Sequence, residues 1–327
     1  MTAAPLLFVT GATGCVGRAV IARALAAGWR VRGLARHALP SGDPLLVGLD
    51  LRVGSVTDEH AVRESAAGAR AIVHLAAWVH AEPRDSAEHD ELHRTIVDGT
   101  AHVARAAAAE GARLVNASTV AVYGSWLPSP CDEATPPAAE SPYARAKLAA
   151  EAAAALVPGA TSLRIALVHG PHDRGNLLRL LRAIDRGLAF VVGDGTNRKS
   201  LVYVEHLAAR VLRLIEADRA GGIFIAADAP APTQRELVVA LSRALGRRPP
   251  PRLPRAPLEW AGAAVDLARR AVRAQGGSWR QRVKKLAAPT EFRGDRLDAL
   301  LGYQPELTLD ESLQRTVAWW KHQELRP

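Results

Sequence analysis

A glycine-rich turn near the start of the chain constrains its fold more than any other feature. Gly11, Gly14 and Gly17 follow the apolar run of residues 6–10 and open a helix-like segment, in the stretch FVTGATGCVGRAV. This spacing lets the backbone turn tightly and approach a pyrophosphate at the positive end of a helix. A second apolar run, RVRGLAR, follows at the distance expected of a strand–helix–strand unit. The context favours dinucleotide binding over a plain glycine-rich turn.

Short apolar runs alternate with helix-like segments through the first half of the chain. Such alternation predicts an α/β fold, a doubly wound parallel sheet of the Rossmann type, with near-continuous apolar strands buried on both faces. The run TSLRIALVHG adds a sixth strand, and the alternation loosens after about residue 170. We therefore expect a smaller mixed α/β substrate domain in the C-terminal part. The predicted domains are residues 1–168 for dinucleotide binding, with 201–226 packing back on it, and residues 169–200 with 227–327 for substrate.

Composition narrows the class of protein further. The chain is 48% hydrophobic and 23% charged, as in ordinary globular proteins, and it has no apolar run long enough to span a bilayer. No signal peptide is expected, because the first apolar run is short and looks like a strand. Cys15 and Cys131 form neither a disulfide framework nor a metal spacing, which favours a reduced, cytoplasmic location. His89 and His93 lie four residues apart without a third ligand, so no metal site is predicted.

The positive charge of the chain is concentrated in one segment. Residues 243–296 hold fourteen Lys and Arg against four Asp and Glu, while the whole chain carries a net charge of +9. A basic segment indicates an acidic partner, such as substrate phosphates or anionic lipid, or simply a solvated face. Residues 257–274 read as an amphipathic helix, which fits a cover over the substrate pocket better than a membrane surface. Nucleic-acid binding is not expected, because no basic sheet with interleaved aromatic residues is present.

The end of the second apolar run bears on the choice of cofactor. A carboxylate at that place would bind the ribose 2′-hydroxyl of NAD, but the sequence has Ala35 and Arg36 there. An arginine can hold the 2′-phosphate of NADP as a bidentate partner. We therefore predict NADP as the cofactor, with NAD remaining possible if Arg36 only stacks on adenine.

A tyrosine and a lysine share one helix face in SPYARAK, residues 141–147. Ser141 can cap the helix, so Tyr143 lies in its first turn and Lys147 one turn later. The run NASTVAVYG delivers Ser118 and Thr119 to the carboxyl edge of the sheet, where ligands bind in open α/β folds. A nearby ammonium and a positive nicotinamide ring would lower the pKa of the phenol. The set suits proton transfer coupled to hydride transfer at a carbinol carbon.

These motifs together carry a resemblance to a known family. TGATGCVG, HLAA, STVAVYG, PYARAK, LRIALVHGP and LVYVEHLA occur in this order. The chain resembles the extended short-chain dehydrogenase/reductases, the group that includes nucleotide-sugar epimerases, dehydratases and 4-ketoreductases, over almost its whole length. The resemblance is highly specific for the superfamily and weakly specific for the reaction.

The resemblance implies roles for individual residues. Tyr143 would be the acid/base, Lys147 would hold the nicotinamide ribose, and Thr119 would bind the reacting oxygen. The implied cofactor contacts are Gly11, Thr13, Gly14, Cys15, Val16, Gly17, Arg36, Ser55, Val56, Leu75, Ala76, Ala77, Tyr143 and Lys147. The implied substrate contacts are Ser118, Asn176, Arg198, Lys199 and Arg280. A homodimer is also expected, since related proteins often pair through two helices beside the fifth strand.

Two reactions remain open at this point. One is NADPH-dependent reduction of a keto group, most plausibly on a nucleotide-linked sugar. The other is 4-epimerisation with a retained cofactor, and Arg36 favours the first. Apolar or steroid-like alcohols are a third possibility for the substrate. A cofactor-sensing protein without activity would have no need of the Tyr–Lys–Thr set.

Overall fold

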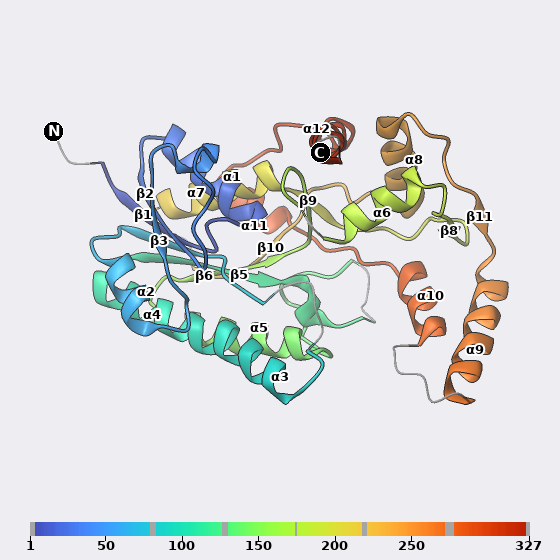
Figure 1. Ribbon diagram of the computed structural model, residues 1–327, viewed down its shortest axis with the longest axis horizontal. Helices are drawn as coiled ribbons and strands as arrows, with labels where there is room; N and C mark the ends of the chain where they lie inside the picture. The colour runs from blue at the N-terminus through green and yellow to red at the C-terminus, as the bar shows by residue number, and fades with distance from the viewer. Residues whose placement is uncertain are drawn as a thin grey trace.

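Seven parallel strands form the central sheet of the protein (Figure 1). The computed structural model describes residues 4–78, 83–125, 130–173, 175–217, 221–271 and 278–324. The strand order is β10-β6-β5-β4-β1-β2-β3, which confirms the predicted Rossmann-type fold. The strands are β1 (Leu6–Thr10), β2 (Arg30–Ala35), β3 (Leu49–Val53), β4 (Ala71–His74), β5 (Arg113–Thr119), β6 (Thr161–Ile165) and β10 (Gly222–Ala226).

Helices cover both faces of this sheet. In Figure 1, α1 (Cys15–Ala26), α7 (Val204–Glu216) and α11 (Asp295–Leu301) lie above it, and α2 (Glu59–Ala66), α4 (Gly99–Glu110) and α5 (Pro142–Ala154) lie below. The upper core joins Leu7 and Val9 of β1 to Leu207 of α7 and Leu297 of α11. Residues after 200 therefore complete the core on which the glycine turn rests.

The predicted sixth strand is divided in two. The apolar run 161–169 was expected to form one strand, but it leaves the main sheet after β6. Ala166 instead donates its backbone N–H to the carbonyl of Ala226, 3.0 Å away. The chain then continues as β7 (Leu167–His169), which pairs with β9 (Leu201–Tyr203) in a separate parallel sheet. Both pieces are apolar, so the sequence pattern does not mark the break.

The long helical segment after β4 also contains an irregularity. It comprises α3 (Ser86–His93), a π-helical turn η2 (Arg94–Asp98) and α4. A π turn carries an extra residue per turn and is frequent at functional sites. Here the π turn contacts α5 on one side, and on the other side it lines a cleft at the carboxyl ends of the strands.

The C-terminal part is built mainly from helices and short strands. Its elements include α6 (Asn176–Asp185), β8 (Val191–Val192), α8 (Gln234–Leu245), β11 (Arg252–Leu253), α9 (Arg255–Ala271), α10 (Trp279–Ala287) and α12 (Leu309–Glu324). Short 3₁₀ turns η1 (Pro44–Leu46) and η3 (Val120–Tyr123) occur in the first half of the chain. In Figure 1, α9 and α10 lie side by side at one end of the molecule. Among the described residues, we find no helix long and apolar enough to cross a bilayer.

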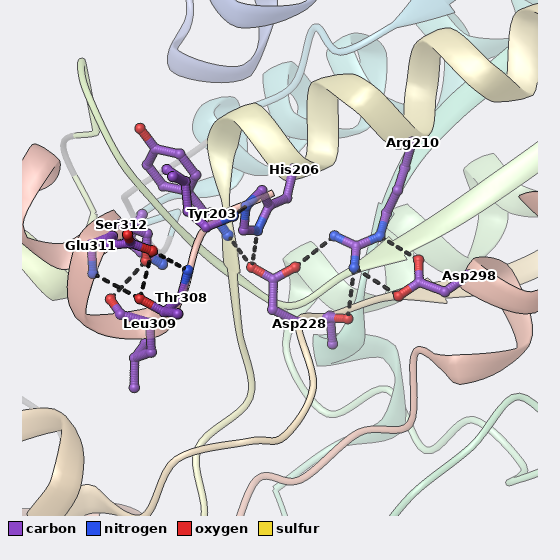
Figure 2. A network of polar contacts seen from close by, with 12 residues as sticks. Tyr203, His206, Arg210, Asp228, Asp298, Thr308, Leu309, Glu311 and Ser312 are labelled. Atoms are coloured by element: carbon purple, nitrogen blue, oxygen red, sulfur yellow. Dashed lines mark hydrogen bonds and ion pairs between the residues drawn. The ribbon is translucent and has the colours of Figure 1, made fainter. Parts of the chain in front are cut away.

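A buried ion-pair network ties the C-terminal part to the sheet (Figure 2). Arg210 of α7 has no exposed side-chain surface, and it donates to Asp228 after β10 at 2.6 Å and to Asp298 of α11 at 2.7 and 2.9 Å. His206 contacts the other oxygen of Asp228 at 2.9 Å. Three segments distant in sequence therefore meet at one guanidinium.

Candidate active site

Close backbone packing explains why the turn after β1 is made of glycine. Gly11 has a positive φ of +68°, and a Cβ there would lie 2.8 Å from the backbone nitrogen of Ala76. A Cβ on Gly17 would lie 2.3 Å from the carbonyl oxygen of Gly11. Gly14 begins α1 as its N-cap and donates its N–H to Gly11 at 3.0 Å. The turn therefore brings the helix amides against the segment after β4.

A buried polar cluster fixes that segment. The hydroxyl oxygen of Thr10 accepts the N–H groups of Leu75 and Ala76 at 3.2 Å each, and it lies 2.7 Å from Nδ1 of His74. The other ring nitrogen of His74 lies 3.0 Å from Thr100. Burial, with the charge of Lys147 adding to it, lowers the pKa of His74 to about 3. The imidazole is therefore a neutral structural group.

An open cleft runs along the carboxyl ends of β1 to β4. Its volume is about 550 Å³. The structure brings together here the following residues from the cofactor prediction: Gly11, Thr13, Gly14, Arg36, Ser55, Val56, Leu75, Ala76 and Ala77. Cys15, Val16 and Gly17 are not part of its lining, because they lie behind the turn in the first helical residues. The cleft has the shape and backbone amides that an extended dinucleotide needs.

Arg32 of β2 and Arg36, which directly follows this strand, have different surroundings. Arg36 is exposed, lines the cleft, and has no hydrogen bond or ion pair to any described residue. Arg32 is instead engaged by Asp50 and by the carbonyl oxygens of Ser65 and Ala67 at 2.9–3.0 Å. Of these two arginines, Arg36 is therefore the one that can bind a ligand.

Sequence reasoning missed one wall of the cleft. Glu91, Arg94 and Thr95 come from α3 and the π turn and line the same cavity. They carry no motif, and their position depends on the extra residue of that turn. Arg94 is a second exposed guanidinium at the cleft and has no partner among the described residues.

Cys15 is a half-buried thiol rather than a ligand group. It donates to the carbonyl oxygen of Pro171 at 3.2 Å. Burial, and to a smaller degree the charges of Asp173 and Glu205, raises its pKa to about 12. The Cys15 side chain therefore packs toward Pro171, and of this residue only the backbone N–H remains available to bind a phosphate.

The tyrosine and lysine of SPYARAK lie at the start of α5. Ser141 caps the helix by accepting the N–H of Ala144 at 3.1 Å, with Pro142 as the first residue. Lys147 is only 4% exposed and donates to the carbonyl oxygen of Ala117 at 2.6 Å. Burial lowers its pKa to about 8, although the charge of Glu151 opposes this shift.

The phenol of Tyr143 is protonated in this environment. Its ring packs against Leu92 and Ile96, and burial raises its pKa to about 12. This direction is opposite to the lowering expected from the sequence, which relied on an ammonium and a positive nicotinamide ring. Thr119 is the last residue of β5, and its hydroxyl accepts the N–H of Ala121 at 3.2 Å. α5 packs directly on β5 and η3, so these groups share one region.

Ser118 does not lie with Thr119 on the ligand side. Its hydroxyl is buried and donates to Glu151 of α5, which also accepts two hydrogen bonds from Arg164 of β6 at 3.0 and 2.8 Å. Neighbouring residues of a strand point to opposite faces, and this alternation explains the difference. The expected substrate contact through the Ser118 side chain is therefore wrong for this structure.

The predicted substrate residues of the C-terminal part are dispersed. Asn176 is exposed at the start of α6, and Arg198 lines a cavity of about 430 Å³ with Asp194, Asn197 and Arg255. Lys199 donates to Ala288 at 2.6 Å, and burial lowers its pKa to about 8. Arg280 belongs to α10, but its side chain lies outside the described residues. Several arginines of the basic segment form ion pairs: Arg243 with Asp310, Arg247 with Asp185, Arg255 with Glu259, and Arg293 with Asp295.

The described part of the chain contains no cluster of three or more His, Cys, Asp or Glu side chains that could hold a metal ion. The groups gathered at the carboxyl edge of the sheet are instead backbone amides, hydroxyls, one phenol and cationic side chains. This donor set fits the phosphates and ribose of a nucleotide cofactor.

Comparisons with known proteins agree with this geometry. The sequence profile of the NAD dependent epimerase/dehydratase family matches residues 7–227. A dTDP-4-dehydrorhamnose reductase of Mycolicibacterium smegmatis is 29% identical over 185 residues, which are 55% of this chain and 51% of that protein. A ceramide reductase of Caulobacter vibrioides is 34% identical over 176 residues, 52% of this chain and 48% of that protein. The matched region thus spans about half the length of these curated relatives.

A solved structure extends the likeness to the whole fold. The Bordetella bronchiseptica enzyme WbmG in complex with NAD has a TM-score of 0.76 at 21% identity, covering 98% of this chain and 94% of that one. The family match covers the glycine turn, the cleft and the Tyr–Lys helix. The chain therefore belongs to the NAD dependent epimerase/dehydratase family.

Proposed function

We propose that this protein reduces a ketone with NADPH and that Tyr143 supplies the proton. The observation that carries the proposal is the half-buried phenol of Tyr143, with a raised pKa, one helical turn before the buried ammonium of Lys147. A reductase needs its general acid protonated before hydride arrives. Burial keeps this phenol protonated, and the neutral ring of NADPH adds no charge that would change this.

Each residue of the set then has a defined role. The cofactor, when bound, supplies the hydride. Thr119 donates a hydrogen bond to the substrate carbonyl oxygen, and Tyr143 transfers its phenolic proton to that oxygen as negative charge develops there. The proton transfer leaves a phenolate, which the ammonium of Lys147 stabilises. Lys147 also binds the nicotinamide ribose, for which it exchanges its contact with Ala117.

The preference for NADPH rests on Arg36. Its guanidinium is exposed at the end of β2 and has no partner among the described residues, so a 2′-phosphate would not have to displace an ion pair. A charge-assisted bidentate contact of this kind is among the stronger polar interactions in proteins. NAD binds the same cleft without this contact.

The substrate that fits best is a nucleotide-linked keto sugar. Its diphosphate suits the cavity beside Asn197, Arg198 and Arg255, with Asn176 exposed on the same part of the chain. The sugar-nucleotide reductase from Mycolicibacterium smegmatis supports this class. A second candidate is a long-chain apolar ketone, because the ceramide reductase is the relative with the higher identity.

The first experiment identifies any nicotinamide cofactor retained by the purified protein, then titrates NADPH and NADH by fluorescence. Empty protein that binds NADPH better than NADH supports the reductase, whereas tightly retained NAD⁺ supports an epimerase that recycles its own hydride. Tyr143→Phe should remove turnover of a dTDP-4-keto-sugar or a 3-ketosphingolipid and leave NADPH affinity within about twofold. Full activity in this variant would refute the mechanism. The predicted homodimer is tested in parallel by light scattering.

A further inference from the structure

Glu151 lies one helical turn beyond Lys147, inside the protein and away from the cofactor cleft. Its side chain is 5% exposed, and its carboxylate accepts two hydrogen bonds from Arg164 and one from Ser118. Arg164 is equally buried, and its guanidinium carbon lies 4.7 Å from the centre of the Tyr123 ring. The two segments that carry the predicted catalytic set, β5 and α5, both meet this ion pair, and so does η3, which follows β5.

The charges in this region do not cancel. Lys147 and Arg164 are cations, Glu151 is the one anion that interacts with Lys147, and His74 is neutral. The buried groups therefore carry one excess positive charge in their resting state. A phenolate at Tyr143 would neutralise it. Without Glu151, these buried groups would include two cations and no anion, and the cation that can lose its proton is Lys147.

We infer that the Glu151–Arg164 pair is a positioning pair, which keeps Lys147 charged and fixes the end of β5 that carries Thr119. The inference rests on the proposed role of Lys147 and extends it to residues that touch neither substrate nor cofactor. Arg164 holds the carboxylate in place through a bidentate contact. Ser118 links the same carboxylate to the end of β5. The Glu151 carboxylate therefore both stabilises the charge of Lys147 and fixes the position of the strand end that carries Thr119.

The surroundings of Lys147 leave few other groups for this task. The titratable groups that face this part of α5 are His74 from β4, Tyr143 and Glu151 from α5, and Arg164 from β6 with Tyr123 beside it. From α3 and the π turn, apolar Leu92 and Ile96 contact the helix. Among the described residues, Glu151 is the anion whose charge raises the pKa of Lys147.

The test follows NADPH binding across pH 6 to 10. Lys147 holds the nicotinamide ribose only while it is charged, so wild-type affinity should fall above a midpoint near pH 8. Glu151→Gln should move this midpoint about one to two pH units lower. The probe 2′,5′-ADP lacks the nicotinamide ribose, and its affinity should show no such step in either protein.

Three control variants distinguish an effect of charge on the midpoint from an effect on folding. Glu151→Asp keeps the carboxylate and should restore the wild-type midpoint. Glu151→Gln combined with Arg164→Met removes both ions, leaves no orphaned charge, and should give an intermediate midpoint. Asp298→Asn disrupts the other buried ion-pair network at Arg210, so it should lower stability without moving the midpoint.

The outcomes distinguish this inference from the proposed function. If Lys147→Met abolishes the step and Glu151→Gln leaves its midpoint unchanged, the positioning role is wrong and the role of Lys147 stands. If Lys147→Met retains the step, both the role of Lys147 and the inference are refuted.

Discussion

Replacing Arg210 by Met should produce a large, pH-dependent loss of stability. The guanidinium is fully buried between Asp228 and Asp298, and the substitution leaves both carboxylates without their cation. Removing one partner of a buried ion pair costs about 3–5 kcal/mol. An unfolding entropy of about 2.1 cal/mol/K per residue gives a 327-residue chain roughly 0.7 kcal/mol/K. The expected fall in Tm is therefore about 4–7 °C.

The pH dependence of this loss has a definite sign. Burial alone would raise the pKa of Asp228, but the hydrogen bond from His206 and the charge of Arg210 lower it overall in the native protein. Without Arg210 the folded-state pKa rises above its unfolded value, so the folded variant binds more protons and is stabilised as pH falls. Scanning calorimetry should show a smaller difference from wild type at pH 5.5 than at pH 8.

The matched control is Arg213→Met on the same helix. Arg213 is exposed, donates to the carbonyl oxygens of Leu301 and Gly302, and has its guanidinium carbon 5.1 Å from the centre of the Tyr303 ring. Its replacement should cost about 1 kcal/mol or less, a change in Tm of less than about 2 °C. Equal losses from the two variants, or a loss for Arg210→Met that grows toward low pH, would refute the reasoning.

Three further predictions concern the glycine turn, Arg36 and the two cysteines. Gly17→Ala places a Cβ 2.3 Å from the carbonyl oxygen of Gly11, so the turn must shift, and NADPH affinity measured by fluorescence should fall more than tenfold. Arg36→Gln should weaken 2′,5′-ADP by about ten- to a hundredfold and 5′-AMP by less than threefold; equal losses would place Arg36 away from the 2′-phosphate. Cys15, with its raised pKa, and the buried Cys131 should react with a thiol reagent at pH 8 only after unfolding; rapid labelling of the native protein would contradict this.

Periodicity was sufficient to predict six strands of the main sheet and the helices between them. It did not single out β10, which lies in a segment expected only to pack back on the dinucleotide-binding domain. Strands buried on both faces are apolar throughout, and glycines mark the turn where backbones approach closely. The break between β6 and β7 was not predictable in this way, because both sides of Ala166 are apolar and the difference lies in which strand each side pairs with. The π turn at Arg94–Asp98 was equally hidden, since it changes the helical register without a change in composition.

The site was predictable where it depends on backbone position. The glycine turn and the residues that follow β2, β3 and β4 line the cleft as expected, because the carboxyl ends of parallel strands share one edge. Side-chain direction and solvation were harder to predict. Ser118 faces Glu151 rather than the cleft, and burial of Tyr143 outweighs the expected effect of a nearby ammonium on its pKa. Arg94 lines the cleft because of the π turn, and no local sequence motif predicts that turn.

The position of β10 at the end of the sheet has a consequence for synthesis and dissection of the chain. β10 is the seventh strand of the sheet and pairs with β6, yet residues 222–226 are made after two-thirds of the protein. Until they emerge from the ribosome, β6 is an edge strand paired only with β5. Leu7 and Val9 likewise lack the α7 side of their core until residues 204–216 have been made. A fragment ending at residue 168 would expose both surfaces and aggregate. We therefore expect that the nucleotide-binding half, although sequence motifs define it, does not fold independently.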